Sequence, residues 1–278
     1  MEKTQARILL ILIVVTIMLV SCVDNNREAH VSTQEPLFSD EEIEEFRLLA
    51  EQDDDESQFN LGMNYLVTGD GIQAVYWLTR AADQGHIIAQ SNLGMYYRDI
   101  YQDHEQAAYW FRKAAKQGLA ASQHNLGLAY RHGQGVTHNN EQAAYWYRRA
   151  AEQGRAESQY NLGVLYEEGS GVRQGFEQAV YWYRKAVEQE LAPAQNNLGM
   201  MYATGRGVIQ NYEQSAYWFR KGAEQGEPMA QSNLGWQYQN GLGVEQSYEQ
   251  AAYWYRRAIA QGNAQAQANL ATLPAQYR

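Results

Sequence analysis

The stretch "EQAAYWYRRAAEQG", residues 141–154, places a Tyr-Trp-Tyr cluster between pairs of alanines at helical spacing. Closely similar stretches begin at Glu177, "EQAVYWYRKAVEQE", and at Glu249, "EQAAYWYRRAIAQG". A Trp or Tyr side chain brings roughly 150–250 Å² of surface and needs small neighbours against which to pack. One helical hairpin is too small to bury such side chains alone. The recurrence therefore predicts that successive copies stack and share their aromatic residues.

The copies follow a regular period. Leu-Gly pairs recur at intervals of 32, 33 and then 36 residues, and a Trp recurs on nearly the same interval. The Leu residues of these pairs are Leu61, Leu93, Leu126, Leu162, Leu198 and Leu234, and a final Leu-Ala pair begins at Leu270. A period of roughly 20–50 residues indicates a stacked array. We expect the glycines and the alanines to supply the hollows into which the tryptophans pack.

Each unit is predicted to contain two helices. In "AESQYNLGVLYEEG", residues 156–169, the small and apolar residues share one helical face. "EGSGV", residues 168–172, then interrupts the helix with two glycines, which adopt a positive φ without steric cost. "FEQAVYWYRKAVEQ", residues 176–189, starts a second helix. The sequence thus predicts an all-α chain of helical hairpins.

The stretch "AQSNLGWQYQNGLGVEQSYEQAAYWYRRAIAQG", residues 230–262, resembles the Sel1-like repeat, a relative of the tetratricopeptide repeat. The resemblance extends over about residues 57–273. It implies a right-handed α/α superhelical solenoid that serves as a platform for protein partners. Six repeats are expected over 57–262, followed by a half-repeat over 263–278 that closes the array.

Two features depart from the regular pattern. The first two units have "TGDG" and "RDIYQDHE" between their helices in place of a Gly-x-Gly loop, so these loops should differ in shape. Glu190 stands where other repeats have a closing glycine, and a left-handed conformation there would cost about 1 kcal/mol. Before the repeats, "SDEEIEEFRLLAEQ" begins at Ser39 with Glu42 three residues later, which predicts a capping helix over 39–56.

The first residues, "MEKTQARILLILIVVTIMLVSC", combine a short positive start with an apolar run from Ile8 to Val20. This pattern is typical of a secretory signal, although a membrane-spanning anchor remains an alternative. The last four of these residues, "LVSC", resemble the bacterial lipobox, which implies removal of residues 1–21 and lipidation of Cys22. Val23 in place of Asp implies sorting to the outer membrane, facing the periplasm. Residues 22–38 are then expected to form a flexible tether.

An asparagine precedes every Leu of the repeated pairs. These residues are Asn60, Asn92, Asn125, Asn161, Asn197, Asn233 and Asn269. An amide both donates and accepts hydrogen bonds, so a row of amides could hold the backbone of an extended peptide. The alternative is a structural zipper, in which each amide bonds to a neighbouring helix or loop. Both interpretations remain open from the sequence.

Beside this row, the residues three after each Leu and five before it vary in chemistry. We expect the members of this wall to select a partner that carries hydrophobic anchors. The residues predicted to contact the partner are Tyr96, Leu165, Met201, Met229 and Gln237.

Other classes of function find little support in the composition. The net charge of −10 disfavours binding to nucleic acid. The six histidines lack the spacing of a metal site, and no serine or cysteine has an evident general base, so neither a metal, a cofactor nor an enzymatic activity is predicted. The leading hypothesis is a non-enzymatic scaffold anchored in the bacterial cell envelope that binds a protein or peptide. The alternatives are a cell-wall binder or enzyme directed at peptidoglycan or β-lactams, and an intracellular adaptor with an uncleaved membrane helix.

Overall fold

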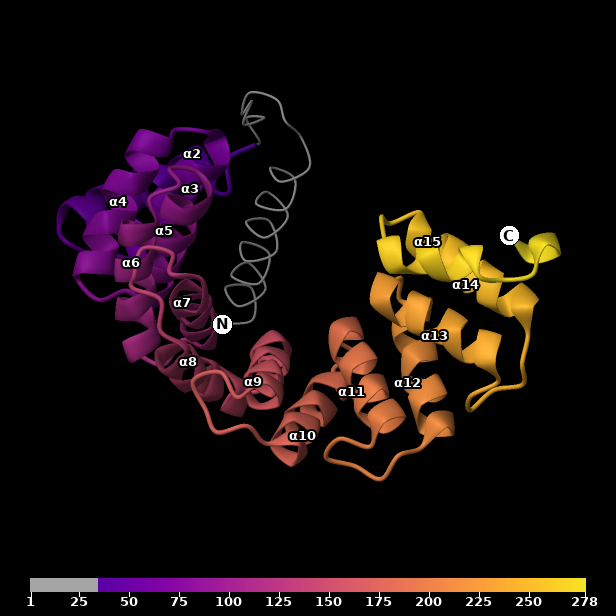
Figure 1. Cartoon of the computed structure of the whole chain (residues 1–278). Coiled ribbons are helices and arrows are strands. Elements are labelled where there is room, and N and C mark those ends of the chain that lie inside the picture. The colour runs from indigo at the N-terminus through magenta and orange to yellow at the C-terminus, as the bar shows by residue number, and fades with distance from the viewer. Residues whose placement is uncertain (1–34) are drawn as a thin grey trace. The chain divides into compact units, whose positions relative to one another are not determined.

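The computed structural model describes residues 35–278, which contain fourteen α-helices, one short 3-10 helix and no β-strand (Figure 1). The predicted all-α class is confirmed for this part of the chain. The expected signal peptide, Cys22 and most of the expected tether lie outside the described residues. The chain divides into two compact units, the first ending at Ala114 and the second beginning at Ala115.

An N-terminal helix, α2 (Asp40–Glu51), precedes six helical hairpins. The first helices of the hairpins are α3 (Asp55–Thr68), α5 (Ile87–Asp99), α7 (Ala120–His132), α9 (Ala156–Glu168), α11 (Ala192–Thr204) and α13 (Pro228–Asn240). The second helices are α4 (Gly71–Asp83), α6 (His104–Lys116), α8 (Asn140–Glu152), α10 (Phe176–Val187), α12 (Tyr212–Glu224) and α14 (Tyr248–Ile259). A lone first helix, α15 (Ala264–Ala271), and a 3-10 turn over Ala275–Tyr277 follow the last hairpin.

Local sequence fixes where these helices begin and end. Asn211 and Ser247 precede α12 and α14, and each side chain accepts a hydrogen bond from a backbone N–H three residues later, at 2.9 and 3.2 Å. The first helices of the second unit end at glycines with φ between 66° and 73°, namely Gly133, Gly169, Gly205 and Gly241. Only glycine takes this left-handed conformation without strain, which explains why the predicted helix breaks occur there.

Within each hairpin, the glycine of the Leu-Gly pair receives the side chain that follows the Trp, which is an aromatic ring in five hairpins and Leu78 in the first. A Cβ atom on Gly163 would lie 2.6 Å from the ring of Tyr183, so any larger residue would collide with it. The tryptophans pack elsewhere: Trp182 packs against a cluster formed by the preceding second helix and its own first helix, and Trp254 belongs to a similar cluster. Our expectation that the tryptophans fill the glycine hollows is therefore wrong. One residue turns a helix by about 100°, which sends adjacent rings to different sides.

Three Gly-x-Gly loops of the second unit, those of Gly171, Gly207 and Gly243, pack against the repeat before their own. A Cβ atom on Gly171 would lie 2.1 Å from the carbonyl carbon of Asn140, at the start of the preceding second helix. Gly207 and Gly243 make the same close approach to Phe176 and Tyr212. The second glycine of each loop thus allows two backbones to come together where no side chain would fit.

A ladder of glutamines also ties successive repeats together. In five of the six first helices, one glutamine donates to a backbone carbonyl at the end of the preceding helix: Gln58 to Ala50, Gln90 to Ala82, Gln123 to Ala115, Gln159 to Ala151 and Gln231 to Ala223, at 2.8–3.2 Å. A second glutamine, near the end of the same hairpin, donates to the side chain of the first, as Gln189 does to Gln159 at 2.9 Å. These bonds satisfy helix-terminal carbonyls that would otherwise be buried without partners.

A capping helix forms before the first repeat, but α2 ends at Glu51, short of the predicted residue 56, and α3 begins at Asp55. The Ser39 side chain accepts from the backbone of Glu42, and the Glu42 carboxylate accepts from the Ser39 backbone, which completes a capping box. The Leu37 amide donates to Asn64 Oδ1 at 3.0 Å, and Phe38 packs edge-on against Phe46. These two residues are therefore ordered against the first repeat, and the tether expected to reach residue 38 ends before them.

Glu190 adopts a φ of 59°, in the left-handed region. The expectation that this position requires a glycine-like conformation is confirmed. Its carbonyl oxygen accepts a hydrogen bond from Gln225 Nε2 at 2.8 Å, so the backbone keeps its place in the glutamine ladder despite the strain. The side chain costs about 1 kcal/mol relative to glycine.

Candidate binding surface

The seven asparagines that precede the Leu residues lie where the core meets the surface. Asn92 is buried, and the other six are half-buried. This follows from helix geometry, because the preceding residue is rotated by about 100° from the core-facing Leu.

Several of these amides bond within the protein. The bonds are Asn92 Nδ2 to Met63 Sδ (3.0 Å), Asn197 Nδ2 to the Tyr183 hydroxyl (3.1 Å), Asn233 Nδ2 to Asn196 Oδ1 (2.9 Å) and Gln265 Nε2 to Asn269 Oδ1 (2.9 Å). No hydrogen bond of the Asn161 side chain is found within residues 35–278. The asparagines of α11 and α13 thus behave as the structural alternative predicted. Asn197 uses both of its polar atoms, since its Oδ1 also accepts from Asn196, whereas Asn233 uses only its nitrogen in these bonds.

Two residues predicted to line the binding surface lie in the core instead. Leu165 is 0% exposed and Met201 is 1% exposed, and each packs within its repeat's hydrophobic cluster. Three residues turn a helix by about 300°, which returns the side chain to within about 60° of the core-facing Leu. The assignment of Leu165 and Met201 to a partner-binding wall is therefore wrong.

The other predicted wall residues are more accessible or lie beside a cavity. Tyr96, in the first unit, is half-buried with its ring edge-on to Tyr101, and burial raises the pKa of its hydroxyl. Met229 is exposed at the start of α13, where its sulfur accepts from Asn263 at 3.3 Å. Gln237 is 0% exposed to bulk solvent yet lines a pocket beneath the surface of α13.

The surface side of the first helices in the second unit carries a row of apolar residues that the sequence analysis missed. This inner stripe consists of Leu128, Val164, Met200 and Trp236, each two residues after a repeated Leu. Two residues turn the helix by about 200°, which moves these side chains off the core-facing side. Leu128 and Val164 are half-buried and still pack against hydrophobic clusters. Met200 is 38% and Trp236 is 44% exposed. Four apolar residues in register on a non-core face would have been the signal to find it.

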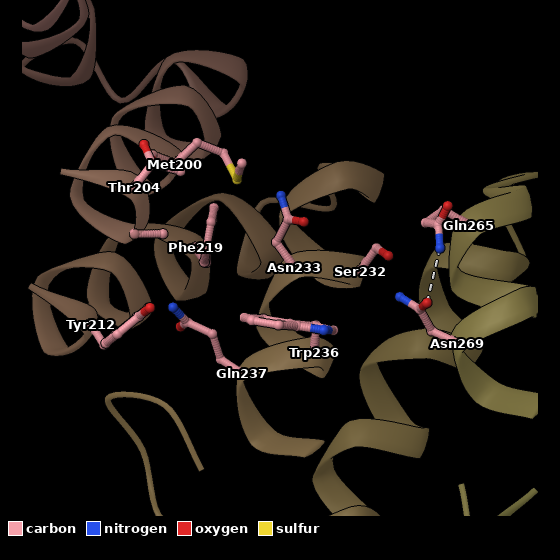
Figure 2. Close-up of a pocket in the computed structure, with 11 residues that line it drawn as sticks. Met200, Thr204, Tyr212, Phe219, Ser232, Asn233, Trp236, Gln237, Gln265 and Asn269 are labelled. Carbon is pink, nitrogen blue, oxygen red and sulfur yellow. Dashed lines mark hydrogen bonds between the residues drawn. The ribbon is translucent and has the colours of Figure 1, made fainter. Parts of the chain in front are cut away.

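A pocket of about 470 Å³ opens beside the stripe, between α11, α13 and α15 (Figure 2). Met200, Ala203 and Thr204 come from α11, Ser232, Asn233, Trp236 and Gln237 from α13, and Gln265 and Asn269 from α15, with Tyr212 and Phe219 from α12 completing the lining. A smaller cavity of about 190 Å³ lies between α7 and α9, beside Leu128 and Val164. The stripe is therefore accompanied by hollows between successive first helices.

The larger pocket is uncharged throughout. None of its lining residues is an acid or a base, although 19% of the whole chain is charged. Asn233, Gln265 and Asn269 provide amides around the ring of Trp236. In Figure 2, Asn233 lies above the ring and the other two lie to its right. Gln237 Nε2 donates to Ser215 at 2.8 Å, whereas its Oε1 is buried without a hydrogen-bond partner. Such an atom costs free energy until a donor reaches it.

Other kinds of site find no basis in the part of the chain that the structure describes. No group of three or more His, Cys, Asp or Glu side chains there is arranged to hold a metal ion. Over residues 35–278, every helix is too short or too polar to traverse a lipid bilayer.

Within each of the two units, helices that follow one another in sequence pack together, which is the arrangement of a helical repeat protein. The chain belongs to the Sel1 repeat family, whose model matches six consecutive segments: 55–86, 87–119, 120–154, 156–191, 192–227 and 228–263. Proteins of this family are generally scaffolds for protein interactions. The resemblance inferred from the sequence is thereby confirmed.

Two solved structures share the fold at substantial identity. One is c5321, described as a protective antigen of uropathogenic Escherichia coli, with 39% identity and a TM-score of 0.75 over 82% of this chain. The match takes in only half of the length of the E. coli protein. The other is a Sel1 repeat protein from Oxalobacter formigenes, with 32% identity and a TM-score of 0.71 over 77% of this chain and 86% of that one. The comparison with curated proteins gave no match.

Proposed function

We propose that this protein is a non-enzymatic scaffold that binds an uncharged segment of a partner protein in the pocket between α11, α13 and α15. The observation that carries this proposal is the exposed Trp236 ring within an uncharged, amide-rich pocket. Tryptophan is enriched among the residues that dominate binding energies at protein interfaces.

The absence of charge around the pocket determines which segment fits. Burying an unpaired charge costs several kcal/mol, and the lining offers no opposite charge to offset that cost. An aliphatic or aromatic side chain, by contrast, would gain contact with Trp236 and Met200. The surrounding amides can bond to backbone N–H and C=O groups of any sequence. The expected partner segment is therefore neutral, extended and anchored by one large apolar side chain.

Substitution of Trp236 tests this assignment. The purified full-length chain would be presented with an array of N-acetylated, C-amidated hexapeptides built from uncharged residues. Trp236→Ala should weaken binding of the best peptides at least about thirtyfold, the loss typical of a central aromatic anchor. Tyr253→Ala, which removes a similarly exposed aromatic residue from α14, provides the matched control and should bind as the wild type does. Equal binding by the wild type and Trp236→Ala would refute the pocket as the docking site.

We further propose that Cys22 carries a lipid anchor that holds the scaffold at the outer membrane of a bacterial envelope, facing the periplasm. The support is the sequence "LVSC" after an apolar run, followed by Val23. Several acyl chains on one residue would give stable attachment, since each buried methylene contributes about 0.8 kcal/mol.

Metabolic labelling with an acyl-chain analogue tests the anchor. The wild type should incorporate label, and Cys22→Ser should remain unlabelled and keep its N-terminal segment. Equal labelling of the two proteins, or none of the wild type, would contradict the proposal and favour the membrane-helix alternative.

A further inference from the structure

A continuous chain of hydrogen bonds leads from α9 to the pocket. Its members are Glu167, Tyr183, Asn197, Asn196 and Asn233, and we call it the amide relay. The Tyr183 hydroxyl donates to Glu167 Oε2 at 2.7 Å and accepts from Asn197 Nδ2 at 3.1 Å. Asn196 Nδ2 donates to Asn197 Oδ1 at 3.1 Å, and Asn233 Nδ2 donates to Asn196 Oδ1 at 2.9 Å. The relay ends at Asn233, which lines the pocket.

The chemistry of Glu167 fixes the direction of every bond in the relay. A carboxylate only accepts hydrogen bonds, so Tyr183 must donate its single proton to Glu167. The tyrosine oxygen is then left to accept, which requires Asn197 to present its NH₂ group and to turn its oxygen toward Asn196. The same reasoning applied to Asn196 orients Asn233 in turn.

The Tyr183 hydroxyl keeps the proton that this order needs. Its side chain is fully buried, and burial raises the pKa of the hydroxyl above its ordinary value, with the hydrogen bond to Glu167 raising it further. Tyr183 therefore remains a neutral donor throughout the physiological range of pH.

At the end of the relay, Asn233 has committed its nitrogen to Asn196, and its oxygen remains for a ligand. Figure 2 shows that oxygen turned toward the side of the pocket where Gln265 and Asn269 lie. Gln237 adds a second acceptor, since its buried Oε1 has no partner. Asn233 Oδ1 and Gln237 Oε1 thus give the pocket lining two acceptors that none of the hydrogen bonds described above uses.

We propose that the pocket recognises backbone N–H donors of an uncharged peptide through Asn233 Oδ1 and Gln237 Oε1, and that Glu167, two repeats away in sequence, is the positioning residue that sets this preference. The proposal rests on the proposed function and specifies its ligand chemistry. A neutral N–H donor fits better than an ammonium group, because no carboxylate lines the pocket to pair with a buried cation.

Neighbouring repeats show that the Tyr183–Glu167 pair, with which the relay begins, is not needed for a repeat to fold. In the repeat of α11 and α12, Phe219 replaces the tyrosine and Ala203 replaces the glutamate, and Phe219 still packs against Gly199. In the repeat of α13 and α14, Tyr255 donates to Gln239 at 2.7 Å. Tyr183→Phe is therefore expected to fold, because the chain already contains that arrangement.

The test uses the hexapeptide that the wild type binds most strongly in the array described above, together with analogues methylated at one backbone nitrogen each. In the wild type, methylation at one or two positions should weaken binding at least about tenfold, because it removes the donor and leaves a buried acceptor unpaired. In Tyr183→Phe and Glu167→Ala, the parent peptide should bind about three- to tenfold more weakly, and the penalty for methylation should fall below about threefold. Tyr147→Phe, the same substitution in another repeat, should behave as the wild type.

The outcomes separate this inference from the proposed function. Binding that survives Trp236→Ala would overturn the pocket itself. Binding that depends on Trp236 but tolerates every N-methylation would overturn the donor preference. A methylation penalty that is the same in the wild type, Tyr183→Phe and Glu167→Ala would overturn the role of Glu167 while leaving the pocket in place.

Discussion

The two sides of the first helices in the second unit follow opposite rules. On the core side, the same residue types recur in the same places: a glycine beneath a ring in every repeat of this unit, and, in most repeats, a glutamine on a helix-terminal carbonyl and a loop glycine against a neighbouring backbone. On the inner-stripe side, the residue at one position changes from Leu128 to Val164, Met200 and Trp236. Repetition thus marks the contacts that build the array, and variation marks the surface on which partners could be distinguished.

The largest loss of stability is expected when a methyl group is placed where the backbones of two repeats come together. Gly171→Ala should lower the free energy of unfolding by about 2–4 kcal/mol, because the new Cβ would collide with Asn140 and the residue has a φ of 68°. Urea denaturation followed by circular dichroism measures the loss. Gly154→Ala is the control: its φ of 92° is at least as unfavourable for alanine but the space around it is open, so about 1–2 kcal/mol is expected. Equal losses would show that the close approach does not contribute.

Substitutions in the glutamine ladder should cause the next largest loss of stability. Gln159→Ala should cost about 1–3 kcal/mol, because it leaves the buried Ala151 carbonyl without its donor and removes one of the two acceptors of the Gln189 amide. The same substitution at Gln267, which has the same register in α15 but is exposed, should change stability by less than about 0.5 kcal/mol. Thermal melting of the two variants side by side is sufficient, and a Gln159→Ala protein as stable as the wild type would contradict a structural ladder.

The smallest loss of stability is expected at the half-buried asparagines, which lie between the core side and the inner stripe. Asn197→Ala removes a link in the amide relay and should destabilise the protein by about 1 kcal/mol. Asn161→Ala, at the same position one repeat earlier, should have almost no effect, since no hydrogen bond to that side chain is found within the described residues. Comparable melting temperatures for the two variants would mean that the relay contributes nothing to stability.

The sequence was sufficient to predict features that depend on period and composition. The hairpins, their boundaries, the capping box at Ser39 and the left-handed conformation at Glu190 all follow from local patterns. The residues that line the binding surface were harder to predict, because moving one position along a helix changes the direction of the side chain by about 100°. For that reason Leu165 and Met201, which are buried, were assigned to the surface. The relay was not predictable at all, since it joins residues from three successive repeats whose separation in space the repeat period does not give.

The glutamine ladder runs in one direction along the chain. In each bond between repeats the donor belongs to the later repeat and the acceptor to the earlier one, as when Gln159 donates to Ala151 and Gln189 to Gly154. A ribosome releases the N-terminal part of a chain first, at roughly 5–20 residues per second. The carbonyl acceptors of each repeat are therefore already in place when the glutamine donors of the next repeat are synthesised. Each hairpin can fold onto the preceding one during translation, before the rest of the protein is made.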